Sequence, residues 1–242
     1  MHLHLDISGG LTGDMFIAAV LDAFPRFERR VIGAIDALDA TYPVSCSLVA
    51  QSENEMFGHR FEIEPFVKYL GHIPHAFPEE PAHWESVRER LIGAEIGPDV
   101  RLHATKIFGL MVRAEAAAHG IAPERVLFET GAWNSIAQVV GAAALIDALD
   151  SSNWSVSALP SGGAVSLAGA AIADYLCPPR ARGRPLPQAR AFVRSGTGFG
   201  LTSQRNHVRL LCFEAGEAAL TEQADAPPPR HATRRPDQQT SQ

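Results

Sequence analysis

A glutamate and a histidine one helical turn apart form the clearest pair in this sequence that could do chemistry together. Glu115 and His119 lie in a segment with helical periodicity, so their side chains can reach one ion or bond to each other. Carboxylate and imidazole groups both bind divalent transition metals. The alternative is that His119 only ends a helix, where the negative end of the helix dipole favours a protonated imidazole.

The start of the chain carries a second candidate metal-binding pattern. Polar and apolar residues alternate strictly from His2 to Ile7, so a strand would place His2, His4 and Asp6 on one face. These three side chains could converge on a divalent ion. A solvated terminal strand with no ligand role is the alternative interpretation.

A glycine-rich loop follows this strand and is a candidate binding site for an anion. In a loop between strand and helix, backbone N–H groups at Gly9, Gly10, Thr12 and Gly13 can approach a phosphate or carboxylate. The loop matches neither the Walker pattern nor the dinucleotide fingerprint, and Asp14 would repel a phosphate unless a metal intervened. Alternatively, the glycines serve only a tight turn and Asp14 caps the helix.

Other patterns give weaker indications of a site. The histidines His72, His75 and His83 could capture a metal transiently, although ordinary loop composition explains them more simply. The run Ser-Gly-Thr-Gly-Phe-Gly at 195–200 could lie against a nucleotide or another backbone, with a flexible turn as the alternative. The sequence has no Gly-x-Ser-x-Gly pattern, so acyl transfer has little support and no catalytic residue is assigned.

The elements that must position these residues indicate an α/β protein of the mixed α+β type. It starts with strand, glycine-rich loop and helix, and we expect a mixed sheet with packed helices. Helices are expected at 14–24, 28–38, 103–119, 134–149 and 168–175, and strands at 2–7, 43–50, 56–66, 154–158, 191–194 and 207–213.

Changes in composition divide the chain into four parts. An N-terminal α/β part with the glycine-rich loop covers 1–70, a linker rich in proline covers 71–82, and a part with helices and strands covers 83–220. The segment 221–242 has too little apolar surface to order itself, so we expect a disordered tail.

Charge and cysteine content exclude several classes of protein. A net charge of −6 without a basic stripe argues against a nucleic-acid partner. The 3 cysteines are far apart and suggest no disulfide framework, and no apolar run is long enough to span a bilayer. The start of the chain lacks the features of a signal peptide, so we expect a cytoplasmic protein without a membrane partner.

Several of these stretches resemble the nickel insertion proteins for pyridinium-3,5-bisthiocarboxylic acid mononucleotide, often called LarC proteins. The first matching stretch runs from Leu5-Asp6 through Ser8-Gly9-Gly10 to Gly13-Asp14-Met15. The more specific stretch includes Ala114-Glu115-Ala116, His119-Gly120, Glu129, Gly131-Ala132, Ser135-Ile136 and Val140-Gly141-Ala142-Ala143. Further matches are Leu159-Pro160, Gly162, Gly169-Ala170-Ala171 and Gly198-Phe199-Gly200, so the resemblance covers most of residues 3–217.

The resemblance implies that this chain places nickel into the pincer cofactor of lactate racemase-type enzymes. Its substrate would be the cofactor precursor mononucleotide, and the family's chemistry is that of a CTP-dependent nickel chelatase of the lyase type, with Mg or Mn. By comparison with the family motif, the candidate metal ligands are Asp6, Asp14, Glu115, His119 and Glu129. The glycine-rich loop would face the phosphate of the mononucleotide. His2 and His4 are possible additional imidazoles.

The sequence also departs from the family pattern. Where the family has a His-Phe-His-Glu run, this chain has Val126-Leu127-Phe128-Glu129, and Asn134 replaces an aspartate. A family segment between Gly163 and Leu167 is skipped, and no room is left after Glu217 for the family's C-terminal domain. The alternative function is therefore a non-catalytic metal- or cofactor-binding subunit that partners a complete family member or a separate C-terminal domain.

Overall fold

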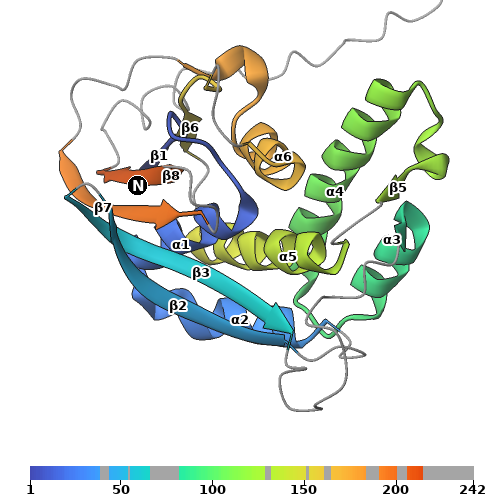
Figure 1. Ribbon diagram of the computed structural model, residues 1–242, viewed down its shortest axis with the longest axis horizontal. Helices are drawn as coiled ribbons and strands as arrows, with labels where there is room; N and C mark the ends of the chain where they lie inside the picture. The colour runs from blue at the N-terminus through green and yellow to red at the C-terminus, as the bar shows by residue number, and fades with distance from the viewer. Residues whose placement is uncertain are drawn as a thin grey trace, which may run out of the picture.

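The computed structural model describes residues 1–38, 44–53, 55–65, 82–128, 132–150, 153–160, 165–183, 191–200 and 206–214 (Figure 1). In these segments a six-stranded sheet has the order β2-β3-β7-β8-β1-β6. Its strands are β1 (His2–Asp6), β2 (Val44–Glu53), β3 (Met56–Pro65), β6 (Trp154–Val156), β7 (Phe192–Phe199) and β8 (His207–Phe213).

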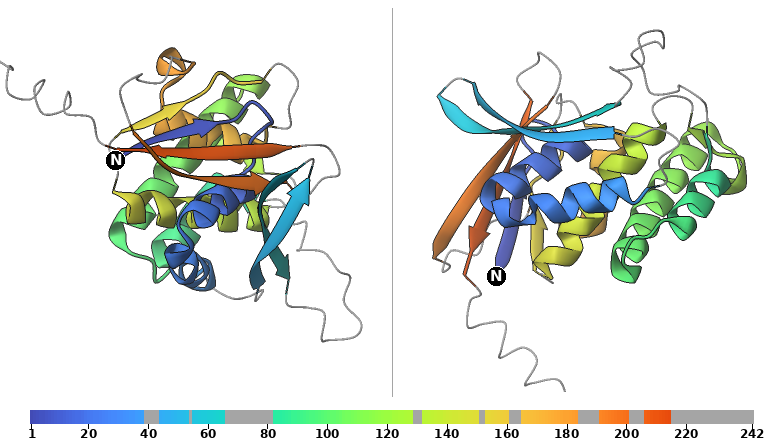
Figure 2. Two further views of the ribbon diagram at one scale, coloured as in Figure 1. Left: turned by 90° about the vertical axis from the view of Figure 1, so that its left-hand side faces the viewer. Right: turned by 90° about the horizontal axis from the view of Figure 1, so that it is seen from below.

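Helices pack on one side of the central strands, as Figure 2 shows. They are α1 (Gly13–Ala23), α2 (Glu28–Asp36), α3 (Trp84–Gly93), α4 (Pro98–His119), α5 (Ala132–Leu149) and α6 (Leu167–Leu176). A second, two-stranded sheet joins β4 (Ala82–His83) to β5 (Leu127–Phe128) beside α4. The main sheet contains parallel pairs, such as β1 with β6, and antiparallel pairs, such as β1 with β8. The expected mixed α+β fold is thus confirmed.

The alternating pattern of β1 decides which face of the sheet receives the helices. Leu3, Leu5 and Ile7 are completely buried on the helix side, in the same hydrophobic cluster as α1 and α5. Successive side chains of a strand point to opposite faces, so His2 and His4 lie on the other side of the sheet. The apolar half of the pattern therefore fixes the strand on the core, and the polar half faces away from the helices.

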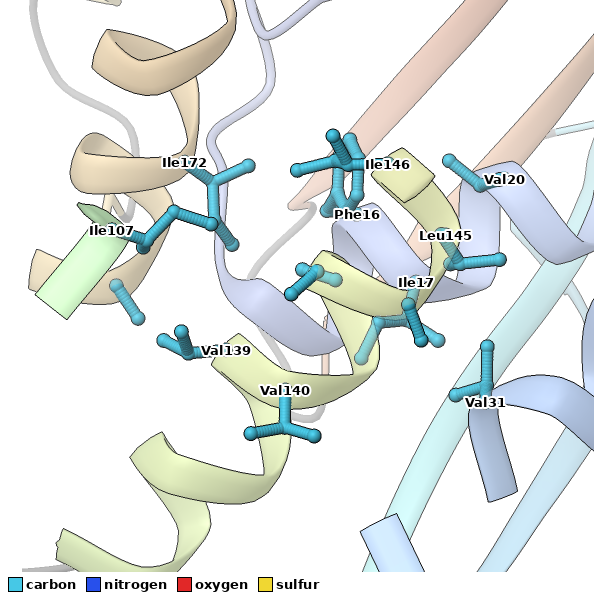
Figure 3. Close-up of a cluster of buried hydrophobic side chains, with 14 of the residues drawn as sticks. Phe16, Ile17, Val20, Val31, Ile107, Val139, Val140, Leu145, Ile146 and Ile172 are labelled. Carbon is cyan, nitrogen blue, oxygen red and sulfur yellow. The ribbon is translucent and has the colours of Figure 1, made fainter. Parts of the chain in front are cut away.

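Helix α5 is apolar along most of its length and lies in the middle of the helical layer. Its buried valines and alanines contact α1, α2, α4 and α6. Figure 3 shows Val139 and Val140 of α5 among side chains of these four helices, including Phe16, Ile17, Val31, Ile107 and Ile172. A helix buried on all sides needs small residues where neighbours come close, and a Cβ at Gly141 would lie 2.8 Å from Ile17 Cδ1.

The glycine run at 195–200 lies in strand β7 up to Phe199, so the flexible-turn interpretation is wrong for these residues. A Cβ at Gly198 would come within 2.0 Å of the Met15 carbonyl oxygen, and one at Gly196 within 2.1 Å of the Ala19 carbonyl oxygen. The glycines let the strand lie directly on the backbone of α1. The expectation that this run lies against another backbone is confirmed.

Most other element expectations agree with the structure. The two segments around 43–66 form the antiparallel hairpin β2–β3, and the helix expected at 103–119 extends back to Pro98. Asn134 and Ser135 do not cap α5, because this helix begins two residues earlier, at Ala132. The division into parts stays a prediction, since 71–81 and 221–242 lie outside the described residues.

No helix in the described segments is long and apolar enough to cross a membrane.

Candidate functional site

A pocket of about 560 Å³ opens where the ends of four helices meet. Its walls come from the start of α1, the end of α4, the start of α5 and the start of α6, together with β5 and two residues next to β7 and β8, Gly200 and Asn206. The lining residues are Thr12, Asp14, Met15, Met111, Glu115, His119, Leu127, Phe128, Asn134, Ser135, Gln138, Ser166, Leu167, Ala168, Gly200 and Asn206. Three of the five predicted metal ligands, at positions 14, 115 and 119, therefore share one pocket.

Glu115 and His119 lie side by side in the last turns of α4. The His119 Nε2 atom is 3.3 Å from the Glu115 Oε2 atom, and the histidine is the more exposed of the two, at 67% against 32%. Gly120, with a φ of 62°, ends the helix just beyond them in the left-handed conformation. The helix holds the pair in place, and its end leaves the imidazole open to solvent and to the pocket.

Asp14 lies at the start of α1 and is only 5% exposed. Burial raises the pKa of its carboxyl group, and the nearby Thr12 hydroxyl and the backbone N–H groups of Asp14 and Met15 partly offset this effect. Thr12 Oγ1 is itself buried without a hydrogen bond of good geometry in the described part of the chain. Asp14 is therefore a buried acid whose charge is only partly compensated.

The glycines of the first loop serve the backbone, and only Thr12 of the four loop candidates lines the pocket. A Cβ at Gly9 would lie 2.5 Å from the His207 carbonyl oxygen, and one at Gly13 would lie 2.7 Å from Gln138 Cβ. Gly10 has a φ of 115°, which side chains rarely allow. These contacts fit the tight-turn interpretation of the loop and bring β8 and α5 against it.

Asp6 does not line this pocket. Its Oδ1 atom accepts a hydrogen bond of 3.1 Å from the Ser8 N–H, and it pairs in register with Arg209 of β8. This bond closes the turn after β1. Asp6 thus has a local structural role at the end of the strand.

The two histidines of β1 are buried, so the solvated-strand interpretation is wrong for them. Each is 7% exposed. His2 Nε2 lies 2.8 Å and His4 Nδ1 lies 2.9 Å from the Ser155 hydroxyl of the neighbouring strand β6. Burial lowers the pKa of His4, and the charge of Asp6 opposes this shift. A neutral imidazole is thus favoured at position 4.

In the segments that the structure describes, no three histidine, cysteine, aspartate or glutamate side chains are close enough together to hold a metal ion. Glu129, the fifth predicted ligand, lies outside these segments. The protein groups available to an ion in the pocket are thus the Glu115–His119 pair, with Asp14 in the same cavity. Such a set leaves most coordination positions of an ion to water or to another ligand.

Sequence reasoning missed several polar residues of the pocket wall. Gln138 follows Asn134 by one helical turn and is 8% exposed, and Ser166 caps α6 by accepting a bond of 3.0 Å from the Gly169 N–H. The signal for Gln138 was available, because it is a polar residue in an otherwise apolar run from 136 to 146. No local signal placed Ser166 opposite α1.

Comparison of the sequence with known proteins identifies the family of this chain. The family model described as nickel insertion protein matches residues 3–173. The chain belongs to this family. The match includes every lining residue of the pocket except Gly200 and Asn206.

Individual relatives agree with this family assignment. A protein of Geobacter sulfurreducens named "Putative nickel insertion protein" is 31% identical over 66% of this chain and 39% of its own length. The pyridinium-3,5-bisthiocarboxylic acid mononucleotide nickel insertion protein of Lactiplantibacillus plantarum is 30% identical over 57% of this chain and 35% of its own length. The chain thus matches less than half the length of these family members. No solved structure matches it.

Proposed function

We propose that this chain takes part in nickel insertion into pyridinium-3,5-bisthiocarboxylic acid mononucleotide, and that ion and mononucleotide meet in the pocket between α1, α4, α5 and α6. The observation that carries the proposal is the Glu115–His119 pair at the mouth of a pocket whose wall also contains Asp14. The relative from L. plantarum, named for this substrate, supports the choice of mononucleotide. The product would be the pincer cofactor of lactate racemase-type enzymes.

Among the described residues, the small number of candidate protein ligands in the pocket fits an ion that must be passed on. Nickel is the cargo of this reaction, and a closed cage of protein ligands would hold it back. Glu115 and His119 supply one oxygen and one nitrogen, so the remaining coordination positions stay open to water and then to the sulfur atoms of the substrate. The pair would bind the ion first, and the sulfur ligands would draw it away.

Asp14 is suited to act as a proton acceptor in the same pocket. Nickel replaces a proton when it bonds to a ring carbon, so a group nearby must accept that proton. Because burial raises the pKa of Asp14, its carboxylate is a stronger base than an exposed aspartate. We assign this role to Asp14, and we leave CTP with Mg or Mn to the portion of the family sequence that this chain does not match.

The direct test is a calorimetric titration of the purified chain with Ni²⁺. We expect binding in the wild type and a loss of at least about tenfold in affinity in Glu115→Gln and in His119→Ala, because each removes one of two ligands. The matched control is His59→Ala, which breaks another carboxylate–imidazole pair, with Asp22 at 2.7 Å, whose residues do not line this pocket. The proposal would be contradicted if the wild type gave no heat of binding with Ni²⁺, or if His59→Ala lost as much affinity for Ni²⁺ as the two pocket variants.

A specific observation favours the second candidate, a subunit that binds metal or mononucleotide without completing insertion. The positions that correspond to the family's two lost imidazoles are packing positions here. Val126 is completely buried against Val112 and Ala116, and Phe128 contacts the ring of Phe108. No change of rotamer would make these residues ligands.

Transfer, measured separately from binding, distinguishes the two functions. The nickel-loaded chain would be mixed with the mononucleotide, and the nickel content of the small-molecule fraction would be measured by mass spectrometry. Insertion requires a nickel-bearing product that is absent with His119→Ala. The binding subunit requires nickel to stay with the protein, with transfer appearing only after a complete family member is added.

A further inference from the structure

The pocket is electrically polarised by the helices that form it. Thr12 precedes α1, Asn134 and Ser135 lie in the first turn of α5, and Ser166 precedes α6. The opposite wall is the C-terminal end of α4, with His119 as its last residue. Helix N-termini carry partial positive charge and C-termini partial negative charge, so one side of the pocket favours anions and the other favours cations.

The positive N-terminus of α1 already binds an anionic group of the protein, the carboxylate of Asp14. The Asp14 carboxylate accepts hydrogen bonds from its own N–H and from that of Met15. Among the described lining residues, the N-termini of α5 and α6 have no such carboxylate. In α6, Ser166 takes the N–H of Gly169, which leaves the first two N–H groups, those of Leu167 and Ala168, beside the pocket.

Gln138 independently indicates a ligand on this side of the pocket. The residue is only 8% exposed, lines the pocket and makes no hydrogen bond within the described segments. Its amide atoms are not among the fully buried atoms without a partner, so they are open to the pocket, where a ligand or water can bond to them. Ser135, on the same wall one turn before it, also has no hydrogen bond within those segments.

We infer that Ser135, Gln138 and the first N–H groups of α6 form the binding site for the phosphate of the mononucleotide, and that the substrate lies with its ring toward Glu115 and His119. This inference rests on the proposed function, because the substrate is taken from it. It places the phosphate at α5 and α6 and not at the glycines of the first loop, which pack against His207 and Gln138. A pocket of about 560 Å³ has room for one mononucleotide.

The recognition would depend on neutral donors. No lysine or arginine is among the described residues that line the pocket. A phosphate held by hydroxyl, amide and backbone N–H groups makes short directional bonds, and its affinity depends little on salt compared with a site of exposed cations.

The test compares two commercially accessible pyridinium compounds, nicotinic acid mononucleotide and its riboside, which lacks the phosphate. Both would be titrated into the full chain by calorimetry. We expect the mononucleotide to bind at least about tenfold more tightly than the riboside, since hydrogen bonds to a charged group contribute about that much. Equal affinities for the two compounds in the wild type would overturn the inference.

Two variants locate the preference on α5. Ser135→Ala and Gln138→Met should each bring the affinity for the mononucleotide down toward that for the riboside. Gln138→Met keeps the side-chain volume against Gly13, and Ser135→Ala is the second variant if this contact proves sensitive. The matched controls Ser47→Ala and Gln51→Met, both in strand β2, should keep the full preference. Unchanged preference in both folded pocket variants would also overturn the inference.

Failure of this inference and failure of the proposed function have different signatures. Glu115→Gln should weaken Ni²⁺ binding and leave the preference for phosphate intact. If nickel binds in the pocket but the phosphate gives no preference, the orientation is wrong and the function stands. If the phosphate is preferred but Ni²⁺ gives no heat, the anion site stands and the nickel proposal fails.

Discussion

Asp14 has a buried carboxyl group that we expect to serve the proposed function and to lower the stability of the fold. Its pKa is raised in the folded chain by burial, so the folded state binds the proton more tightly than the unfolded state does. Stability contributed by this group is therefore present at low pH and is lost as the pH rises through the folded pKa. At neutral pH the buried charge destabilises the fold.

We therefore predict that Asp14→Asn raises the free energy of unfolding at pH 7. The amide has nearly the same shape and its oxygen can still accept the N–H groups of α1, but it carries no charge. The gain over the wild type should shrink as the pH falls toward 4, because the wild-type carboxyl becomes protonated. Urea unfolding at several pH values measures this, and an equal or reversed difference at pH 7 would contradict it.

Ser155 is the second residue for which the structure predicts an effect on stability, because two buried imidazoles lie against its hydroxyl group. His2 and His4 both lie within hydrogen-bond distance of its Oγ atom. Ser155→Ala should lower the free energy of unfolding by about 1–3 kcal/mol, the cost of leaving buried polar groups without their partner. Thermal and urea unfolding measure the loss, and the exposed Ser47→Ala should change stability by less than about 0.5 kcal/mol.

At the residue scale, sequence reasoning succeeded where chemistry was local. The spacing of Glu115 and His119 on one helix fixes their distance, so their proximity followed from periodicity alone. The approach of Gln138 to Gly13 depends on how α5 crosses α1, and spacing along the chain holds no information about it. The anion side of the pocket could therefore be found only in the folded molecule.

At the element scale, the strands and helices with strong periodicity could be predicted from the sequence. Elements whose conformation depends on packing against other parts of the chain were predicted less well. The last strand was expected at 207–213 and is found at His207–Phe213. The glycines before it suggested a turn because glycine favours turns in isolated segments. Close packing on α1 makes the same residues part of β7, since no larger side chain would fit there.

Two glycine substitutions test this explanation. Gly198→Ala would place a Cβ 2.0 Å from the Met15 carbonyl oxygen, whereas Gly33→Ala in α2 meets no atom within 4 Å. We expect the first to lower the free energy of unfolding by about 3 kcal/mol or to prevent folding. The second should raise it by about 0.5–1 kcal/mol through the helix preference of alanine. Chemical denaturation measures both, and similar effects at the two positions would show that β7 does not need the close approach.

At the scale of the whole molecule, one pocket joins both proposed ligands, so their binding should be coupled. In the proposed arrangement the phosphate lies at one end of the cavity, and the ring of the mononucleotide reaches the ion at the other end and would bond to it directly. We predict that saturating nicotinic acid mononucleotide raises the affinity for Ni²⁺ by roughly fivefold or more, and that nickel raises the affinity for the mononucleotide by the same factor. Paired titrations measure both factors, and independent binding would place the two ligands in separate sites.

The order of strands in the main sheet has a consequence for the time course of folding. Strand β1 at the start of the chain has β8 as a neighbour, with His2 opposite Phe213, and the hairpin β2–β3 reaches the rest of the sheet only through β7. During synthesis the helices of the pocket emerge before the two strands that complete the sheet beneath them. Until β8 is made, the edge of β1 that pairs with β8 has no hydrogen-bonding partner strand. Completion of the sheet should therefore be slow compared with the formation of the helices.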